Sequence, residues 1–84
     1  SGEEVAHSKP APDVFLAAAK ALKAAPEQCL VIEDSANGVL AGKRAGMKVL
    51  GYQNPTSGPQ DLSLADRVVT DFITAKLWIF SEVP

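Results

Sequence analysis

Two adjacent carboxylates, Glu33 and Asp34, follow directly after the apolar run Cys29-Leu30-Val31-Ile32. Like charges on neighbouring residues repel one another, and the cost of the pair increases as it is buried. A cation bound by both carboxylates would offset this cost. A site built only from carboxylate oxygens favours Mg²⁺, which keeps several water ligands and shares its coordination shell with a substrate phosphate. The pair therefore predicts a magnesium site.

The two carboxylates are expected to have unequal roles, because adjacent residues of a strand face opposite sides. We predict that Asp34 is a direct ligand and that Glu33 is a more distant ligand or acts through water. The residues alone also allow a second interpretation, in which Asp34 caps the following helix and Glu33 is solvated. Both interpretations stay open at this point.

A single lysine, Lys9, stands before Pro10 in a loop that leads into a helix. Pro10 favours an extended backbone at Lys9 and so holds it at the mouth of a turn. The intervening helix returns the chain to a neighbouring strand, so Lys9 is predicted to face the same cleft as Asp34. An ammonium and Mg²⁺ in one cleft neutralise charge on a phosphoryl group during its transfer. The alternative is an ordinary solvated loop lysine.

Helical and extended segments alternate along the chain, which predicts right-handed β-α-β units. The expected fold class is α/β, with a partial Rossmann-like parallel sheet and flanking helices. Ligands of such sheets bind beyond the carboxyl ends of the strands, where Glu33 and Asp34 are placed. The sequence predicts helices at residues 12–24, from 34 or 35 to 45, and 72–80, and strands at residues 28–32, 48–52 and 67–69.

Several local features support these elements. The strand that ends at Ile32 is a short continuous apolar run, which predicts burial on both faces. Gly46 is predicted to end the second helix in the left-handed conformation. The first helix is predicted to begin at Pro12 and to pack through one face, made of Val14, Phe15, Ala18 and Leu22.

The composition is that of a globular chain of 84 residues, with 46% hydrophobic and 21% charged residues. Its net charge of -2 argues against a nucleic-acid or anionic-membrane surface. Cys29 is the single cysteine, which predicts a buried thiol in a reducing compartment. No run approaches the roughly 18 apolar residues of a membrane span, and residues 1–10 have no signal-peptide core. We expect a cytoplasmic protein.

The segments KPAPDVFLAAAKAL and VIEDSANGVLAGKRAGMKVLGY together resemble the C-terminal half of the haloacid dehalogenase-like hydrolases. The similarity is to the branch of β-phosphoglucomutase and phosphoglycolate phosphatase and covers residues 3–72. It implies that Lys9 is the phosphate-binding lysine, which steadies an aspartyl-phosphate intermediate. It also implies that Asp34, with Glu33, is the acidic Mg²⁺ motif.

Three further residues, Ser35, Asn37 and Gly38, fall inside the same motif. We interpret them as residues of a helix start: a cap, a polar neighbour, and room for close backbone approach. His7, which precedes the lysine, is predicted to be an exposed loop residue.

The family's nucleophile lies in an Asp-x-Asp-Gly motif near the N-terminus, followed by a cap domain, and no Asp-x-Asp occurs in these 84 residues. The resemblance therefore implies that residues 1–84 are the C-terminal portion of a core domain, which needs the N-terminal portion of the same protein as its partner. The strand that ends at Ile32 would then expose an edge.

The function expected from the resemblance is that of a Mg²⁺-dependent phosphatase or phosphomutase acting on a small phosphorylated metabolite. The nucleophile would lie outside this chain, so the chain alone is expected to be inactive. Two alternatives are a non-catalytic α/β binding or interaction module, and a structural fragment whose acids only cap a helix.

Overall fold

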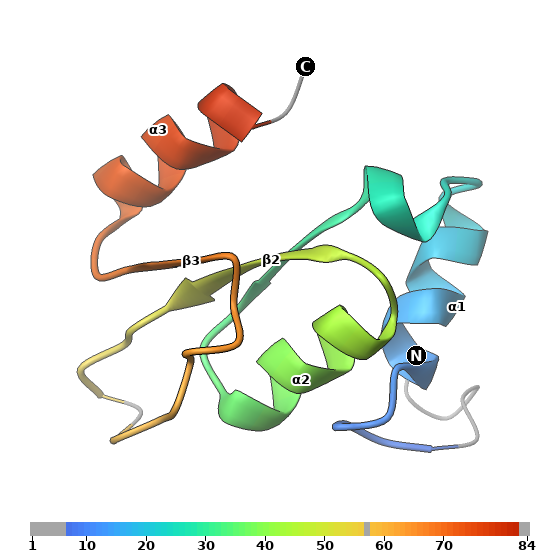
Figure 1. The fold of residues 1–84 in the computed structure, drawn as a ribbon, viewed down its shortest axis with the longest axis horizontal. Coiled ribbons are helices and arrows are strands. Elements are labelled where there is room, and N and C mark those ends of the chain that lie inside the picture. Colours follow the sequence, from blue (N-terminus) through green and yellow to red (C-terminus); the bar gives the residue numbers. More distant parts are fainter. Residues whose placement is uncertain (1–6, 57, 83–84) are drawn as a thin grey trace.

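The computed structural model describes residues 7–56 and 58–82 (Figure 1). Three short parallel strands form one sheet in the order β1-β2-β3, and helices flank the sheet. This confirms the predicted α/β fold class. In chain order the elements are α1 (Asp13–Ala21), the 3-10 helix η2 (Pro26–Gln28), β1 (Leu30–Glu33), α2 (Ala36–Arg44), β2 (Lys48–Tyr52), β3 (Arg67–Val69) and α3 (Phe72–Glu82).

The two faces of the sheet pack against different helices. Alternate residues of a strand point to opposite faces, so Val49 and Leu50 of β2 enter two separate clusters. On one face, α1 and α2 pack against β1 and β2 through a cluster that includes Ala19, Val31, Val39, Met47 and Val49. On the other face, α3 packs against β2 and β3 through Leu50, Val69, Ala75 and Trp78.

Both ends of α2 follow the predicted chemistry. Ser35 is the N-cap residue, and its hydroxyl accepts a hydrogen bond of 3.0 Å from the backbone N–H of Gly38. Of the two predicted caps, Ser35 rather than Asp34 therefore has this role. Gly46 ends the helix with φ +79°, and its N–H donates to the carbonyl of Lys43.

The first helix is shorter than predicted and turns a different face to the core. It spans Asp13–Ala21 rather than residues 12–24, because the chain enters a left-handed turn at Lys23 (φ 56°). Leu22 lies beyond the helix end and is 74% exposed, and Ala18 is also exposed. The buried residue is Ala19, which lies one turn after the half-buried Phe15. Inclusion of Ala18 and Leu22 in the core face was therefore wrong.

The first strand also differs from expectation in three ways, the first being that it ends at Glu33 rather than at Ile32. It begins at Leu30 rather than residue 28, because residues 26–28 form the 3-10 helix. It is not buried on both faces, since Ile32 is 54% exposed. Within the described residues β1 pairs only with β2, so its outer edge carries no strand, as expected for an edge at this position. Cys29, just before β1, is half-buried rather than fully buried.

Candidate functional site

The candidate site lies where β1 ends and α2 begins, beside the loop that precedes α1. Lys9 extends from this loop, and its Nζ lies 3.4 Å from Oε2 of Glu33, the last residue of β1. The same Nζ lies 5.9 Å from the centre of the Phe15 ring on α1. The structure therefore brings the predicted lysine to one of the two predicted carboxylates, at the carboxyl end of a parallel strand.

Short contacts position the loop that carries Lys9. The N–H of Ala11 donates to the carbonyl of Ser8 at 3.0 Å, which closes a turn around the lysine, and the Lys9–Pro10 peptide bond is cis. Arg44, at the end of α2, donates from Nη1 to the carbonyl of Pro10 at 3.4 Å. These contacts place the base of the lysine side chain next to α2. His7 is exposed, as predicted, and lies 3.0 Å from the Asp13 carboxylate.

Glu33 has partners at both carboxylate oxygens. Oε2 faces Lys9, and Oε1 accepts a hydrogen bond of 3.0 Å from the Ser35 hydroxyl. The Glu33 side chain is only 13% exposed, whereas that of Lys9 is 41% exposed. Glu33 is thus packed against the first turn of α2. It is not solvated, in contrast to the interpretation in which the two carboxylates bind no metal.

Asp34 lines a cavity next to this pair. The cavity has a volume of about 270 Å³ and is formed by Ile32, Glu33, Asp34 and Tyr52, at the carboxyl ends of β1 and β2. Both predicted carboxylates contribute to this cavity. Glu33 also contacts Lys9 and Ser35, and the unequal roles of the two carboxylates stay a prediction.

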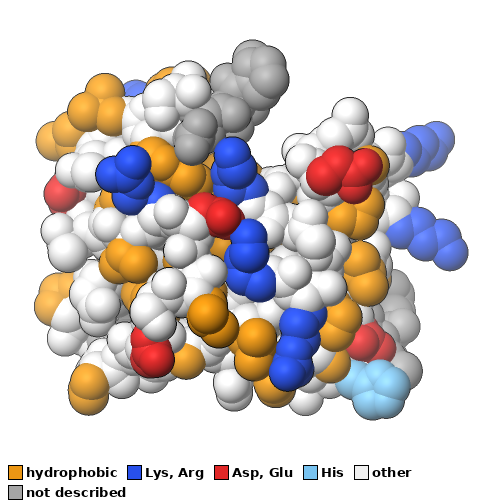
Figure 2. Space-filling view, viewed as in Figure 1, with side chains coloured by type: hydrophobic (Ala, Val, Ile, Leu, Met, Phe, Trp, Pro, Cys, Tyr) orange, Lys and Arg blue, Asp and Glu red, His pale blue; other side chains and the backbone are white. Residues whose placement is uncertain are grey.

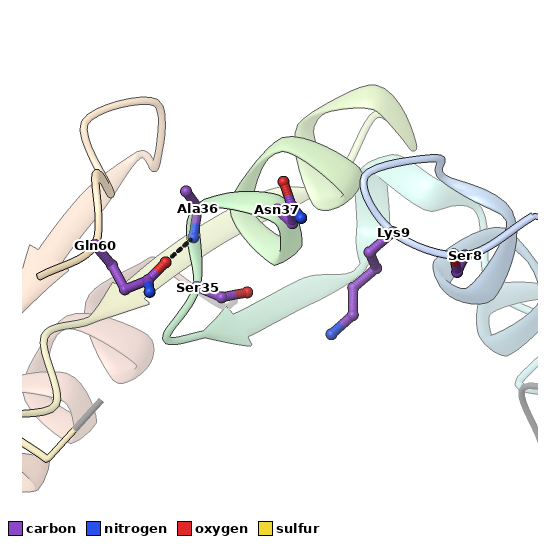
Figure 3. Close-up of a pocket in the computed structure, with 6 residues that line it drawn as sticks. All are labelled: Ser8, Lys9, Ser35, Ala36, Asn37 and Gln60. Atoms are coloured by element: carbon purple, nitrogen blue, oxygen red, sulfur yellow. Dashed lines mark hydrogen bonds between the residues drawn. The ribbon is translucent and has the colours of Figure 1, made fainter. Parts of the chain in front are cut away.

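A second, larger cavity of about 540 Å³ adjoins Lys9 (Figure 3). Its lining residues are Ser8, Lys9, Ser35, Ala36, Asn37 and Gln60. Figure 3 shows that these residues come from the loop before α1, the start of α2, and the loop between β2 and β3. The lining of this space includes an ammonium, hydroxyls and amides beside apolar surface.

Sequence reasoning missed Gln60. Its Oε1 accepts a hydrogen bond of 3.0 Å from the backbone N–H of Ala36, which holds the β2–β3 loop over the first turn of α2. Gln60 lies in the turn-rich segment QNPTSGPQD, where no periodic pattern marks it. A long-range contact of this kind leaves no local signal in the sequence.

The carboxylates fit a magnesium site with few protein ligands. The described residues contain no group of three or more His, Cys, Asp or Glu side chains that could hold a metal ion. Asp34 and Glu33 are two adjacent oxygen donors, which suits Mg²⁺ because this ion keeps several waters and binds through one or two carboxylates.

Another ion pair, near the C-terminal end of α2, has a structural role. Asp66 accepts hydrogen bonds from Lys43 Nζ at 3.0 Å and from the Val49 backbone N–H at 2.7 Å. Burial raises the pKa of Asp66, but these hydrogen bonds and the charges of Lys43 and Lys48 outweigh it, so the net pKa is lowered. Figure 2 shows Lys and Arg side chains gathered with an acidic one in the middle of one face. The contacts of Asp66 with Lys43 and Val49 fix the β2–β3 loop to α2 and β2.

Known proteins match this chain in sequence and in fold. A model of the haloacid dehalogenase-like hydrolase family matches residues 1–46. The bifunctional riboflavin kinase/FMN phosphatase of Arabidopsis thaliana is 45% identical over 75 residues, which cover 89% of this chain and 20% of the relative. Protein CbbY of Rhodobacter capsulatus is 37% identical over 84 residues, which cover 100% of this chain and 37% of that relative.

The structural similarity agrees with the sequence match. The crystal structure of β-phosphoglucomutase from Clostridium difficile superposes with a TM-score of 0.80 at 31% identity, over 95% of this chain and 34% of that one. The chain belongs to the haloacid dehalogenase-like hydrolase family. It spans 20% and 37% of the length of the two curated relatives. In residues 7–56 and 58–82, no helix has the length and apolar character needed to cross a membrane.

Proposed function

We propose that these 84 residues are the C-terminal portion of the core domain of a Mg²⁺-dependent phosphatase or phosphomutase. The nucleophile strand and the cap domain would lie in the remainder of the protein. The observation that carries this proposal is the meeting of Lys9 and Glu33 at the carboxyl end of β1, beside Asp34. The similarity to a bifunctional riboflavin kinase/FMN phosphatase and to a β-phosphoglucomutase supports a small phosphorylated substrate.

The proposed reaction proceeds through an aspartyl-phosphate. A carboxylate from outside this chain attacks the phosphorus, the bond from phosphorus to the ester oxygen breaks, and the leaving oxygen takes up a proton. Water then cleaves the acyl phosphate in a phosphatase, or a substrate hydroxyl takes the phosphoryl group in a mutase. Bound Mg²⁺ would supply a Lewis acid that neutralises phosphoryl charge.

The residues of this chain would act by position and charge. Lys9 would donate hydrogen bonds from its ammonium to phosphoryl oxygens, which carry most of the negative charge in the transition state. Glu33 holds Lys9 near β1 and limits the motion of its long side chain. Asp34 would hold the metal at the ends of β1 and β2. We place the protein in the cytoplasm, an assignment that rests on its single cysteine and on its composition.

Phosphate release by the complete protein tests this proposal. The assay would use a panel of sugar phosphates, phosphoglycolate, FMN and nucleoside monophosphates, with Mg²⁺ and with EDTA. We expect release from at least one phosphomonoester, dependent on Mg²⁺. The same protein carrying Lys9→Ala should release far less phosphate. A complete protein that binds Mg²⁺ but transfers no phosphoryl group would favour the non-catalytic module instead.

A further inference from the structure

Gly38 borders the candidate site without contacting its cavities. It is buried in the first turn of α2, and a Cβ atom built at this position would overlap with Cγ, Cδ and Oε1 of Glu33. The Glu33 side chain therefore occupies the space that any other residue at position 38 would fill. Gly38 thus makes room for the Glu33 side chain, whereas the sequence predicted that it makes room for close approach of another backbone segment.

The same three residues are joined by hydrogen bonds. The N–H of Gly38 donates to the Ser35 hydroxyl at 3.0 Å, and this hydroxyl donates to Glu33 Oε1 at 3.0 Å. One carboxylate oxygen of Glu33 is thus tied to the start of α2. The other oxygen, Oε2, faces Lys9 at 3.4 Å. That distance is already long for a hydrogen bond, so a small displacement of Glu33 would break the contact.

Helix stability does not explain a glycine at this place. Glycine in a helix interior is less favourable than alanine, because it loses more backbone freedom on folding. Gly38 has no left-handed conformation that would require it, unlike Gly46. Close approach of Glu33 is therefore the physical reason for its presence.

We propose that Gly38 is a positioning residue. Because it has no side chain, it leaves a space, here called the slot, that holds the Glu33 side chain. Glu33 in turn fixes the position of the Lys9 ammonium. The role of this ammonium in phosphoryl transfer rests on the proposed function, but the slot itself is a matter of geometry. Gly42 lies one turn further along α2 and offers a comparison. Its Cβ would meet Val49 Cγ2 at 2.6 Å in the core, away from Glu33.

A double-mutant cycle between positions 33 and 38 in the complete protein tests the slot. With Glu33 present, Gly38→Ala should lower the free energy of unfolding and shift the side-chain NMR signals of Lys9. In the Glu33→Ala background the same change should raise the free energy of unfolding, because the three atoms nearest to the added methyl are removed and alanine favours the helix. A loss of stability of equal size in both backgrounds would overturn the proposal.

Two further readouts separate positioning from packing. Gly42→Ala should destabilise the protein in both backgrounds and leave the Lys9 signals unmoved. In an active protein, Gly38→Ala should lower kcat by about a hundredfold, as expected for a misplacement near 1 Å, with a smaller effect on KM. If Gly38→Ala fails to fold, the Glu33→Ala/Gly38→Ala double variant must fold; if it does not, the slot is wrong.

These outcomes distinguish the slot from the proposed function. Unmoved Lys9 signals in a folded Gly38→Ala variant would overturn the positioning role, whatever the enzyme does. Shifted signals together with the reversal of sign, in a protein that transfers no phosphoryl group, would confirm the slot and refute the enzymatic proposal.

Discussion

Lys9 lies on the loop before α1 and Glu33 is the last residue of β1, and their charged atoms meet at 3.4 Å. The pair is partly exposed, so its direct contribution to stability is small, on the order of 0 to 1 kcal/mol. Its importance is geometric, because it aims an ammonium at the carboxyl end of the sheet, where parallel α/β proteins bind ligands.

Removal of the ammonium should therefore affect catalysis far more than folding. In the complete protein we expect Lys9→Ala to lower kcat by about a thousandfold, comparable to the loss of a donor to a developing oxyanion. The thermal unfolding midpoint should change little. Lys20→Ala, at an exposed lysine on α1, is the matched control and should keep full turnover. Normal kcat in the Lys9→Ala variant would rule out its phosphate role.

Metal affinity should depend on Asp34 more than on Glu33. We expect Asp34→Ala to weaken Mg²⁺ binding by at least about tenfold, since even residues outside a metal's ligand shell cost that much when removed. Isothermal titration of the complete protein with Mg²⁺ measures this. Glu27→Ala removes an exposed carboxylate from η2 and should leave the affinity unchanged. Equal affinity in the Asp34→Ala variant would show that the metal assignment is mistaken.

Asp66 should make the stability dependent on pH. Asp66→Ala leaves the Val49 N–H without its acceptor, and we expect a cost of about 1–3 kcal/mol at pH 7. Since the folded-state pKa of Asp66 is lowered, this stabilisation is present above the unfolded-state pKa near 3.9. It is lost as the pH falls through the folded-state pKa.

Urea unfolding from pH 7 down to pH 3 measures the effect of Asp66. The difference between the wild type and Asp66→Ala should shrink below about pH 4, the usual pKa of an unfolded aspartate. A constant difference across this range would mean that the carboxylate charge has no part in the contact. Glu27→Ala again serves as the control for general loss of negative charge.

The 84-residue chain alone should be marginally stable or associate with itself. The outer edge of β1 carries no strand within the described residues, and Ile32 beside it is 54% exposed. Apolar side chains on α3 are also exposed, among them Phe72, Ile73, Leu77 and Phe80. Light scattering during a thermal melt measures both properties. A monomer with a cooperative transition above about 60 °C, high for a mesophilic domain, would contradict this prediction.

A substitution at the strand edge should change this association. Ile32→Thr keeps the strand preference of a β-branched residue but removes apolar surface. We expect less aggregation of the isolated chain, measured by size-exclusion chromatography. Leu22→Thr changes a leucine beyond the end of α1, which is even more exposed than Ile32 but lies away from the strand edge, and serves as the control. Equal aggregation of wild type and Ile32→Thr would show that another surface mediates the association.

Local signals in the sequence were sufficient for most of the fold. The bounds predicted for β2 and β3 are confirmed, and the predicted last helix extends two residues further, to Glu82. Each of these elements is marked by turn residues or by an apolar run nearby. The register of α1 could not be predicted in the same way, because both Ala18 and Ala19 fit a helical period. Tertiary packing against β1 and α2 chose Ala19.

The candidate site was predictable in its members but not in its contacts. Lys9, Glu33 and Asp34 were identified from residue types and from a family resemblance. That Lys9 meets Glu33, and that Asp34 lines a neighbouring cavity, depends on side-chain directions at the end of β1, which the residue pattern does not fix. Gln60 was out of reach, since its partner Ala36 lies in another element and the bond uses backbone.

The hydroxyl of Ser35 is both a hydrogen-bond donor and an acceptor, since it donates to Glu33 and accepts from the N–H of Gly38. Aspartate starts helices as well as serine does, but it has no proton to donate at neutral pH and would add one more carboxylate beside Glu33 and Asp34. Threonine keeps both functions. Among all substitutions at position 35, we therefore expect serine and threonine to keep the fold stable and aspartate to destabilise it. The helix-capping preference alone would rank all three as good choices.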